Sequence, residues 1–360
     1  MRLREVPDIW KPLRQSKDKK YSSLALMLFL GSGLSASIFR SAIIKISAST
    51  RLSTTVTDPF AANDAQSEAA RPLAAANAER SFEKRCTAPG VIKCVGFDSK
   101  REIAAHVSPA WDGVIRGTLD TEIFADGDGS LKFTIPPFSP ANTSGVWSAP
   151  MGKDFGEDTT FFVQWRQRFS PELLKTAFKS NGFKQHIFWH GIGGSCTDVQ
   201  LVTENTYGRG FPQMYTACGA RGLEITRADG DVQLEQGDYN CYYRNQNAAD
   251  CAMYRPNEWM TFYYEVRVGK WNQPSSAVKA WVAYEGKPLK EFIDISRLTI
   301  SNDSPGAKAF RRIDLLPYQT DKDSTIFHPT AYTWYDDLII STQPIPAPSP
   351  KISPGVRTKR

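Results

Sequence analysis

Apolar and polar side chains alternate with a period of two along much of the middle and later parts of the chain. Three segments show this pattern: 160–169, 260–271 and 278–284. In the first segment, Phe161, Val163 and Trp165 share one face, and Gln164 and Arg166 share the other. This period indicates β-strands that each place one face against a core.

Turn-forming sequences separate these segments, among them Asp126-Gly127-Asp128-Gly129 and Glu285-Gly286-Lys287-Pro288. Only residues 170–180 predict a helix, with Ser170 as its N-cap and Pro171 at the first helical position. Many strands and little helix predict an all-β fold, an antiparallel jelly-roll sandwich of two sheets.

Composition divides the chain into four parts. Residues 82–343 carry the strand pattern, and 41% hydrophobic residues overall are enough for a sizeable core. Residues 46–81 are rich in Ala, Ser and Thr, which predicts a flexible linker. Residues 344–360 form a Pro-rich basic tail, which we expect to be extended or disordered.

The first 45 residues have the organisation of a targeting segment. A basic stretch ends at Lys19-Lys20, and an apolar run follows from Leu24 to Phe39. This run is short for the roughly 20 apolar residues of a full membrane span, and it contains small residues suited to a cleavage site. Two interpretations remain: a signal peptide, or an uncleaved signal anchor that tethers the chain through residues 21–45. Both predict a secreted or extracytoplasmic domain, periplasmic or extracellular.

The cysteines favour the same compartment. There are six, and they fall as local pairs: Cys86 with Cys94, Cys196 with Cys218, and Cys241 with Cys251. An even count at short spacings predicts three disulfides in an oxidising environment. Zinc is the competing explanation, but no C-x-x-C motif occurs.

The net charge of +6 belongs to the ends of the chain. Residues 1–20 carry seven basic against three acidic side chains, and residues 345–360 carry four basic side chains and no acidic one. The chain between them is therefore slightly acidic. We expect no nucleic-acid partner for the folded domain.

Two predicted strands carry polar side chains that are useful for chemistry. Period two places Gln164, Arg166 and Arg168 on one face of the first strand. On the segment 184–190, the same period places Lys184, His186 and His190 together, opposite Gln185. A cationic, His-bearing sheet face predicts a surface for an anionic ligand.

The segment Tyr332–Thr342, with the sequence Y-T-W-Y-D-D-L-I-I-S-T, resembles the closing strand of concanavalin A-like jelly-roll polysaccharide lyases, of the alginate-lyase and glucuronan-lyase types. The resemblance covers residues 86–342 as architecture and assigns no single lyase family. It implies an early Arg-bearing strand, a strand similar to Gln-x-His, and a late Tyr-bearing strand. In this chain Arg166 or Arg168, Lys184 with His186, and Tyr318 stand at these places.

The resemblance implies a polysaccharide lyase that cleaves an acidic, uronate-containing polysaccharide by β-elimination. Arg166 and Lys184 would neutralise the uronate carboxylate, since cations suit that role. His186 or His190 would act as the base and Tyr318 as the acid. The further substrate contacts would be Gln164, Arg168, Gln185, Tyr215 and Gln319. This scheme needs no cofactor and no metal, and we expect a monomer.

Two other functions use the same fold. A lectin-like carbohydrate-binding protein would hold a glycan on its Trp and Tyr side chains without cleaving it. A glycoside hydrolase needs two carboxylates at a fixed separation. The E-x-D-x-(x)-E strand pattern of hydrolases with this fold is absent here, which makes hydrolysis the weaker alternative.

Overall fold

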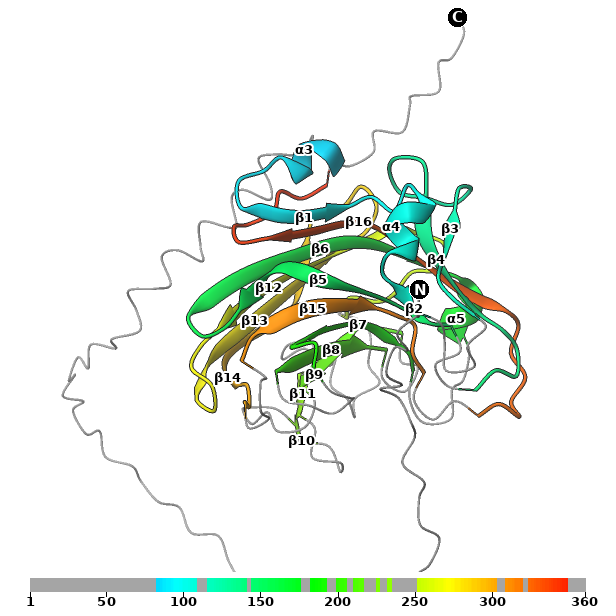
Figure 1. The fold of residues 1–360 in the computed structure, drawn as a ribbon. Helices are drawn as coiled ribbons and strands as arrows, with labels where there is room; N and C mark the ends of the chain where they lie inside the picture. Colours follow the sequence, from blue (N-terminus) through cyan, green and yellow to red (C-terminus); the bar gives the residue numbers. More distant parts are fainter. Residues whose placement is uncertain are drawn as a thin grey trace, which may run out of the picture. The chain divides into compact units, whose positions relative to one another are not determined.

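The structure, a computed structural model, contains two antiparallel β-sheets that lie face to face (Figure 1). It describes residues 82–108, 115–140, 144–175, 182–192, 199–205, 210–216, 225–226, 232–234, 251–302, 308–319 and 323–348. Within these ranges, three short helices accompany the sheets: α3 (Phe82–Cys86), α4 (Lys100–Ala104) and α5 (Pro171–Lys175).

The first sheet, called sheet A here, has the strand order β14-β13-β12-β6-β16-β4-β3, and β1 also pairs with β16. Its strands are β1 (Val91–Val95), β3 (Thr118–Asp120), β4 (Ser130–Ile135), β6 (Thr159–Phe169), β12 (Met260–Val268), β13 (Pro274–Ala283), β14 (Lys290–Thr299) and β16 (Ala331–Ser341). The first and last described strands of the chain therefore lie side by side in this sheet.

The second sheet, called sheet B here, has the order β10-β11-β9-β8-β7-β15-β5-β2. Its strands are β2 (Val107–Ser108), β5 (Val146–Phe155), β7 (Lys184–Trp189), β8 (Gln200–Glu204), β9 (Gln213–Thr216), β10 (Ile225–Thr226), β11 (Val232–Leu234) and β15 (Phe310–Leu315). The predicted all-β jelly-roll sandwich is confirmed.

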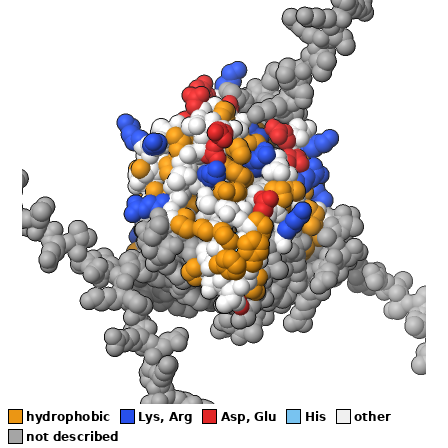
Figure 2. Space-filling model, turned by 90° about the vertical axis from the view of Figure 1, so that its right-hand side faces the viewer, with side chains coloured by type: hydrophobic (Ala, Val, Ile, Leu, Met, Phe, Trp, Pro, Cys, Tyr) orange, Lys and Arg blue, Asp and Glu red, His pale blue; other side chains and the backbone are white. Residues whose placement is uncertain are grey.

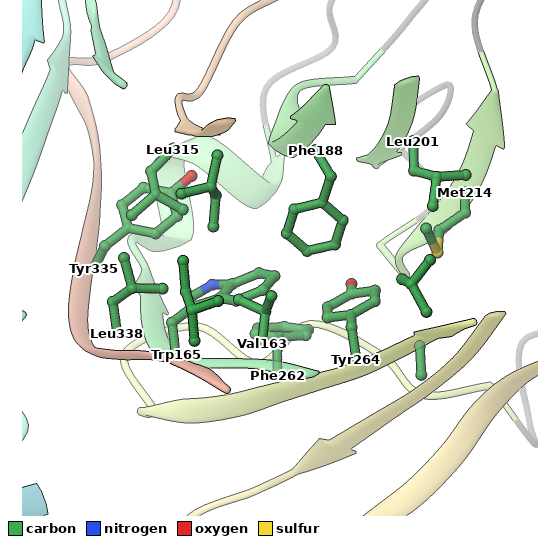
Figure 3. Close-up of a cluster of buried hydrophobic side chains, with 14 of the residues drawn as sticks. Val163, Trp165, Phe188, Leu201, Met214, Phe262, Tyr264, Leu315, Tyr335 and Leu338 are labelled. Atoms are coloured by element: carbon green, nitrogen blue, oxygen red, sulfur yellow. The ribbon is translucent and has the colours of Figure 1, made fainter. Parts of the chain in front are cut away.

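The core between the sheets is dominated by aromatic rings. Trp165 of β6 stacks on Tyr264 of β12, with 5.2 Å between ring centroids and almost parallel planes. Phe188 of β7 meets Tyr264 edge to face from the opposite sheet. Figure 3 shows these side chains pointing toward one another, with Leu201 and Met214 of sheet B beside them. Because buried aromatic side chains carry large areas out of water, this cluster stabilises the contact between the sheets.

The predicted faces of β6 are confirmed. Phe161, Val163 and Trp165 point into the core, and Gln164 and Arg166 lie on the outer face of sheet A. The predicted helix is confirmed over Pro171–Lys175, where the Ser170 hydroxyl accepts the backbone N–H of Leu173 at 3.3 Å.

A cap formed by α3, which leads into β1 of the same sheet, covers part of the outer face of sheet A. Arg85 of α3 donates a hydrogen bond to the Gln164 amide oxygen and forms an ion pair with Asp337 of β16, 2.7 Å between Nη2 and Oδ2. Both charged side chains of this pair are 1% exposed. The Cys86–Cys94 disulfide joins α3 to β1 immediately beside the ion pair.

A bulge in β16 makes this cap possible. Asp337 has a φ of 53°, and the register with β6 shifts between Asp336 and Ile339. Adjacent residues of a regular strand point to opposite faces, but here Asp336 and Asp337 both lie on the outer side. Asp336 accepts the backbone N–H of Ala125 at 2.6 Å, while Asp337 binds Arg85. Both carboxylates therefore have structural partners.

One predicted disulfide, Cys86–Cys94, is confirmed, and Cys251 is also disulfide-bonded. Cys196, Cys218 and Cys241 lie outside the described residues, as do residues 1–81 with the predicted targeting segment and linker. No helix in the described part of the chain has the length and apolar character needed to cross a membrane.

Ile345, which the sequence assigned to the tail, is buried against the outer face of sheet A. Its backbone N–H donates to the Tyr263 hydroxyl at 3.1 Å. The folded domain therefore extends past the end of β16.

Apolar side chains also gather on the face of the domain shown in Figure 2, with charged side chains around them. Among the described residues, the large apolar side chains that are exposed are Ile92, Phe124, Phe138, Ile192, Ile326 and Phe327. The rings of Phe138 and Phe327 lie 5.3 Å apart, which joins the segment after β4 to the segment before β16.

We expect Arg85→Met to lower the free energy of unfolding by about 3–5 kcal/mol, because it leaves the buried Asp337 carboxylate and the Gln164 amide without their partner. Urea denaturation of the domain measures this loss. Lys84→Ala, an exposed change in the same helix, is the matched control and should have little effect. Combining Arg85→Met with Asp337→Asn should recover part of the loss; no recovery would contradict this role for the ion pair.

Candidate functional site

A bulge in β7 decides which side chains of the segment 184–189 face outward. Lys184 is directly opposite Glu204 of β8, but His186 is directly opposite Thr203, so that Gln185 has no partner in the register. The extra residue changes the alternation. Gln185 and His186 both point inward, whereas Lys184, Ile187 and Trp189 lie on the outer face of sheet B.

His186, predicted as the base, lies inside the aromatic core. Its ring centroid is 4.6 Å from that of Trp165, 4.4 Å from Phe188 and 4.7 Å from Tyr264. The side chain is fully buried, and neither ring nitrogen has a hydrogen-bond partner. Burial in this apolar site lowers the pKa of His186 well below its usual value. A base must reach the proton that it removes, and His186 has no access to the outer face.

Gln185, predicted as a substrate contact, joins the two sheets instead. Its amide nitrogen donates to the Gln167 side-chain oxygen of β6 at 2.9 Å, and its amide oxygen accepts the Tyr254 hydroxyl at 3.1 Å. The backbone oxygen of Gln185 accepts the Tyr335 hydroxyl of β16 at 2.7 Å. Every side-chain polar atom of this buried residue is therefore engaged within the core.

The outer face of sheet B brings together three of the predicted residues. The Lys184 ammonium lies 4.8 Å from the ring centroid of Tyr318 and 5.9 Å from that of Tyr215. The backbone N–H of Lys184 also donates to the Tyr318 carbonyl at 2.7 Å. Tyr215 lies in β9 and Tyr318 follows β15, on opposite sides of β7 in the sheet. The two phenol rings thus approach Lys184 from two directions.

An apolar platform lies beside Lys184 on the same face. It consists of Ile187, Val202, Tyr215 and Leu316, against which Val146, Trp189 and Tyr318 pack. The first four side chains are at most 8% exposed, so they form a buried apolar cluster on this side of sheet B.

A buried amide extends the polar row that starts at Lys184. Glu204 is directly opposite Lys184, and Gln213 of β9 is directly opposite Glu204, so the three residues form one row across three strands. Gln213 is fully buried, and both polar atoms of its amide lack a hydrogen-bond partner. Buried polar groups nearly always have partners, so the unpaired amide of Gln213 is unusual.

Arg166 and Arg168 do not join Lys184. They project from β6 on the outer face of sheet A, on the other side of the sandwich. Arg166 is 8% exposed; it donates to the Ala125 carbonyl at 3.4 Å and lies 3.6 Å from a Glu285 carboxylate oxygen. Gln164 on the same face accepts the Arg85 bond. The predicted clamp of Arg166 and Lys184 on one carboxylate is therefore not formed, because a whole sandwich separates the two side chains.

The remaining predicted residues are also buried. His190 is 2% exposed, and its Nδ1 accepts the backbone N–H of Ile192 at 3.1 Å. Gln319 is 1% exposed and donates to the Pro317 carbonyl. Both side chains stabilise the local backbone at the ends of β7 and β15.

A second polar group of the outer face was not predicted from the sequence. Arg312 of β15 donates from Nε to the Ser148 hydroxyl at 3.1 Å and from Nη2 to the Ser148 carbonyl at 2.8 Å. The Ser148 hydroxyl in turn donates to Asp314. Burial raises the pKa of Asp314 to about 6, although the Ser148 bond and the Arg312 charge oppose this rise.

Within the described ranges, no group of three or more His, Cys, Asp or Glu side chains is placed to hold a metal ion. Around Lys184 the outer face of sheet B carries an ammonium, an amide and two phenols, with the Glu204 carboxylate in the same row.

Comparison with solved structures finds the same architecture. The PL-14 alginate lyase of Aplysia kurodai superposes with a TM-score of 0.51 over 70% of this chain and 99% of its own, at 13% identity. The chain has a polysaccharide-lyase-like fold. An alginate lyase from a Chlorella virus (TM-score 0.43, 11% identity, 70% of this chain and 99% of that one) is also similar. The endo-β-1,4-glucuronan lyase of the fungus Trichoderma reesei is similar as well, with a TM-score of 0.41 and 12% identity over 66% of this chain and 94% of that one.

No family model matches the sequence, and comparison with curated proteins gives no match. At such low identity the shared feature is the lyase-like sandwich itself. The activity must therefore be argued from the side chains of this chain.

We expect His186 to make the domain sensitive to acid. The folded-state pKa of His186 lies well below the unfolded value of about 6.5, so below pH 6.5 the unfolded chain binds a proton there that the folded protein does not bind. The free energy of unfolding is therefore unaffected by this group above about pH 6.5 and decreases as the pH falls below it. The free energy of unfolding of His186→Leu should therefore rise by about 1.4 kcal/mol relative to that of the unmodified protein for each pH unit below 6.5.

Urea denaturation of both proteins from pH 8 to pH 5 measures this difference. The range from pH 7.5 to pH 8 is the internal control. There His186 is neutral in both the folded and the unfolded unmodified protein, so the difference in free energy of unfolding between the two proteins should be constant. A difference that stays constant down to pH 5 would show that His186 is protonated within the fold.

Proposed function

We propose that the protein is a polysaccharide lyase that cleaves an acidic, uronate-containing polysaccharide by β-elimination on the outer face of sheet B. One observation carries this proposal: the Lys184 ammonium lies between the rings of Tyr215 and Tyr318, in a row with the unpaired amide of Gln213. The lyase-like fold supports the same conclusion.

β-Elimination on a uronate requires three groups. A proton leaves the carbon next to the carboxylate, its electron pair forms a carbon–carbon double bond, and the glycosidic oxygen departs with a proton. A cation or amide must neutralise the carboxylate, since negative charge develops there as the proton leaves. An acceptor and a donor must then handle the two protons.

The described residues supply groups of these kinds. Lys184 and the amide of Gln213 neutralise the carboxylate, and the ammonium also stabilises negative charge on the proton acceptor. Tyr215 on the β9 side accepts the proton as its phenolate and becomes a neutral phenol. Tyr318 on the β15 side donates its phenol proton to the leaving oxygen and becomes a phenolate. Because the two rings flank Lys184 from opposite sides of β7, a sugar above the ammonium meets one phenol on each side. This scheme replaces His186 as the base.

We expect the unmodified protein to produce unsaturated, ultraviolet-absorbing ends from at least one of alginate, glucuronan, pectate or a glycosaminoglycan. Lys184→Met, Tyr215→Phe and Tyr318→Phe should each lower kcat/KM by at least about 100-fold, the usual effect of removing a proton-transfer or charge-stabilising group. Absorbance and new reducing ends are recorded together for each polymer.

Two controls keep the assignment testable. Arg168→Gln removes a cation from the outer face of sheet A, and His186→Leu removes the buried imidazole; both should keep most of the rate at pH 8. Loss of activity in Arg168→Gln, with Lys184→Met unaffected, would move the site to sheet A. Reducing ends without ultraviolet absorbance would indicate a hydrolase, and binding without any product would indicate a lectin.

A further inference from the structure

Four side chains on the outer face of sheet B form a polar group away from Lys184. Arg312 and Asp314 of β15 are two residues apart, so they project on the same face. Trp189 of β7 is directly opposite Arg312, and Ser148 of β5 is directly opposite Asp314. Directly opposite residues of paired strands share a face. All four side chains are partly exposed, in contrast to the four buried side chains of the apolar platform.

Hydrogen bonds join three of these side chains into one fixed unit. The Arg312 guanidinium donates from Nε to the Ser148 hydroxyl at 3.1 Å and from Nη2 to the Ser148 carbonyl at 2.8 Å. The Ser148 hydroxyl donates to the Asp314 carboxylate. Gly191, with a φ of 80°, leaves room for the Arg312 stem, which a Cβ at position 191 would meet at 2.6 Å. A guanidinium and a carboxylate are therefore held side by side, with one hydroxyl between them.

This unit keeps donors that its internal bonds do not use. Nη1 of Arg312 takes part in none of the bonds to Ser148. The indole N–H of Trp189 is shielded from solvent and completes no hydrogen bond. It nevertheless lies near the Asp314 carboxylate: burial raises the pKa of Asp314 to about 6, and the Ser148 hydroxyl and the Trp189 indole oppose this rise. Because a shielded donor nearly always has a partner, an incomplete bond here points to a ligand.

The chemistry of the unit suits a sugar with free hydroxyl groups. A hydroxyl both donates and accepts, so neighbouring hydroxyls can donate to Asp314 while they accept from Arg312. An indole beside polar groups offers a flat apolar surface to the sugar ring. A second uronate carboxylate suits this place less well, since it would meet the negative charge of Asp314 beside the positive charge of Arg312.

This place binds a different sugar from the one at Lys184. Asp314 is directly opposite Ile187, which is three residues after Lys184, or about 10 Å along the strand. The Lys184 ammonium also leans toward Tyr318, which lies beyond the end of β15 and not beside Asp314. Both places are on one face of neighbouring strands, so one polymer chain can reach both.

We infer that Trp189, Arg312, Asp314 and Ser148 form a hydroxyl-binding subsite, which holds another sugar of the polymer by its hydroxyl groups and ring face rather than by a carboxylate. For the identity of the polymer, this inference rests on the proposed function. It adds that an uncharged sugar is accepted at this distance from Lys184, and that capping the hydroxyl groups of that sugar prevents binding.

The indole N–H of Trp189 reports directly on the subsite. Its signal in a heteronuclear NMR spectrum, assigned with Trp189→Phe, is followed at pH 7.5 while neutral oligosaccharides of glucose, mannose or galactose are added. We expect at least one of them to shift this signal, because its hydroxyl groups change the surroundings of the incomplete N–H bond. The permethylated form of the same oligosaccharide should leave the signal unchanged. This comparison uses the unmodified protein and does not depend on the folding of a variant.

Asp314→Asn is the test variant. Asp128→Asn is the matched control, because Asp128 is an exposed carboxylate in the turn before β4 of the other sheet. Asp314→Asn should weaken binding of the neutral oligosaccharide about tenfold, equivalent to about 1.4 kcal/mol. Arg312→Lys, which keeps the charge but loses the planar fork, should weaken it similarly. Asp128→Asn and Lys184→Met should leave this binding unchanged.

Kinetics on a cleaved polymer give a second readout. We expect Asp314→Asn to raise KM about tenfold with kcat nearly unchanged, because the subsite holds a sugar that does not react. The shortest cleaved oligosaccharide, which does not reach the subsite, should show no change.

The outcomes separate the two proposals. If unsaturated products form but no neutral oligosaccharide shifts the Trp189 signal, the subsite is refuted while the lyase stands. A shift with oligouronates alone, equal binding of the permethylated form, or unchanged binding in Asp314→Asn would refute it as well. If no polymer is cleaved but a neutral oligosaccharide shifts the signal and Asp314→Asn weakens its binding, the subsite stands while the lyase is refuted.

Discussion

The structure depends on the way Gln185 joins the two sheets. Its amide binds Gln167 of sheet A and the Tyr254 hydroxyl, and its carbonyl accepts a bond from Tyr335. These are three hydrogen bonds in a dry aromatic core, where an unmade bond costs about 1–3 kcal/mol. Satisfying them places Gln185 inward and requires the bulge that sends the preceding residue, Lys184, to the other side of the sheet. One buried polar contact thereby places Lys184 on the outer face of sheet B.

The fold could be predicted from the sequence because strand alternation and the closing-strand motif are local sequence patterns. Alternation in β6 correctly divided core residues from outer ones, and the closing strand identified the type of sandwich. The same rule was wrong for β7. It placed Lys184 and His186 on one face, because nothing in the sequence of this segment reveals a bulge. A bulge is set by partners such as Gln167 and Tyr335 that are distant in the chain, so single-strand periodicity cannot find it.

The sequence predicted only some residues of the candidate site, because pairing with distant strands cannot be inferred from one strand alone. Lys184, Tyr215 and Tyr318 were recognised as chemically useful residues, and the structure brings them together. Gln213 was missed although it stands two residues before Tyr215, since only the register of three strands reveals its row with Lys184. Residue type indicates the available chemistry, but pairing between strands decides which groups meet.

The two ends of the described domain lie close to the cap on the outer face of sheet A. Phe82, at the start of the described domain, and Ile345, beyond its last strand, pack in one apolar cluster on the outer face of sheet A. The chain therefore enters and leaves the domain on the side opposite Lys184. A fusion partner or a chemical coupling placed directly at either end of the described domain would therefore begin at the back of the sandwich, on the face opposite Lys184.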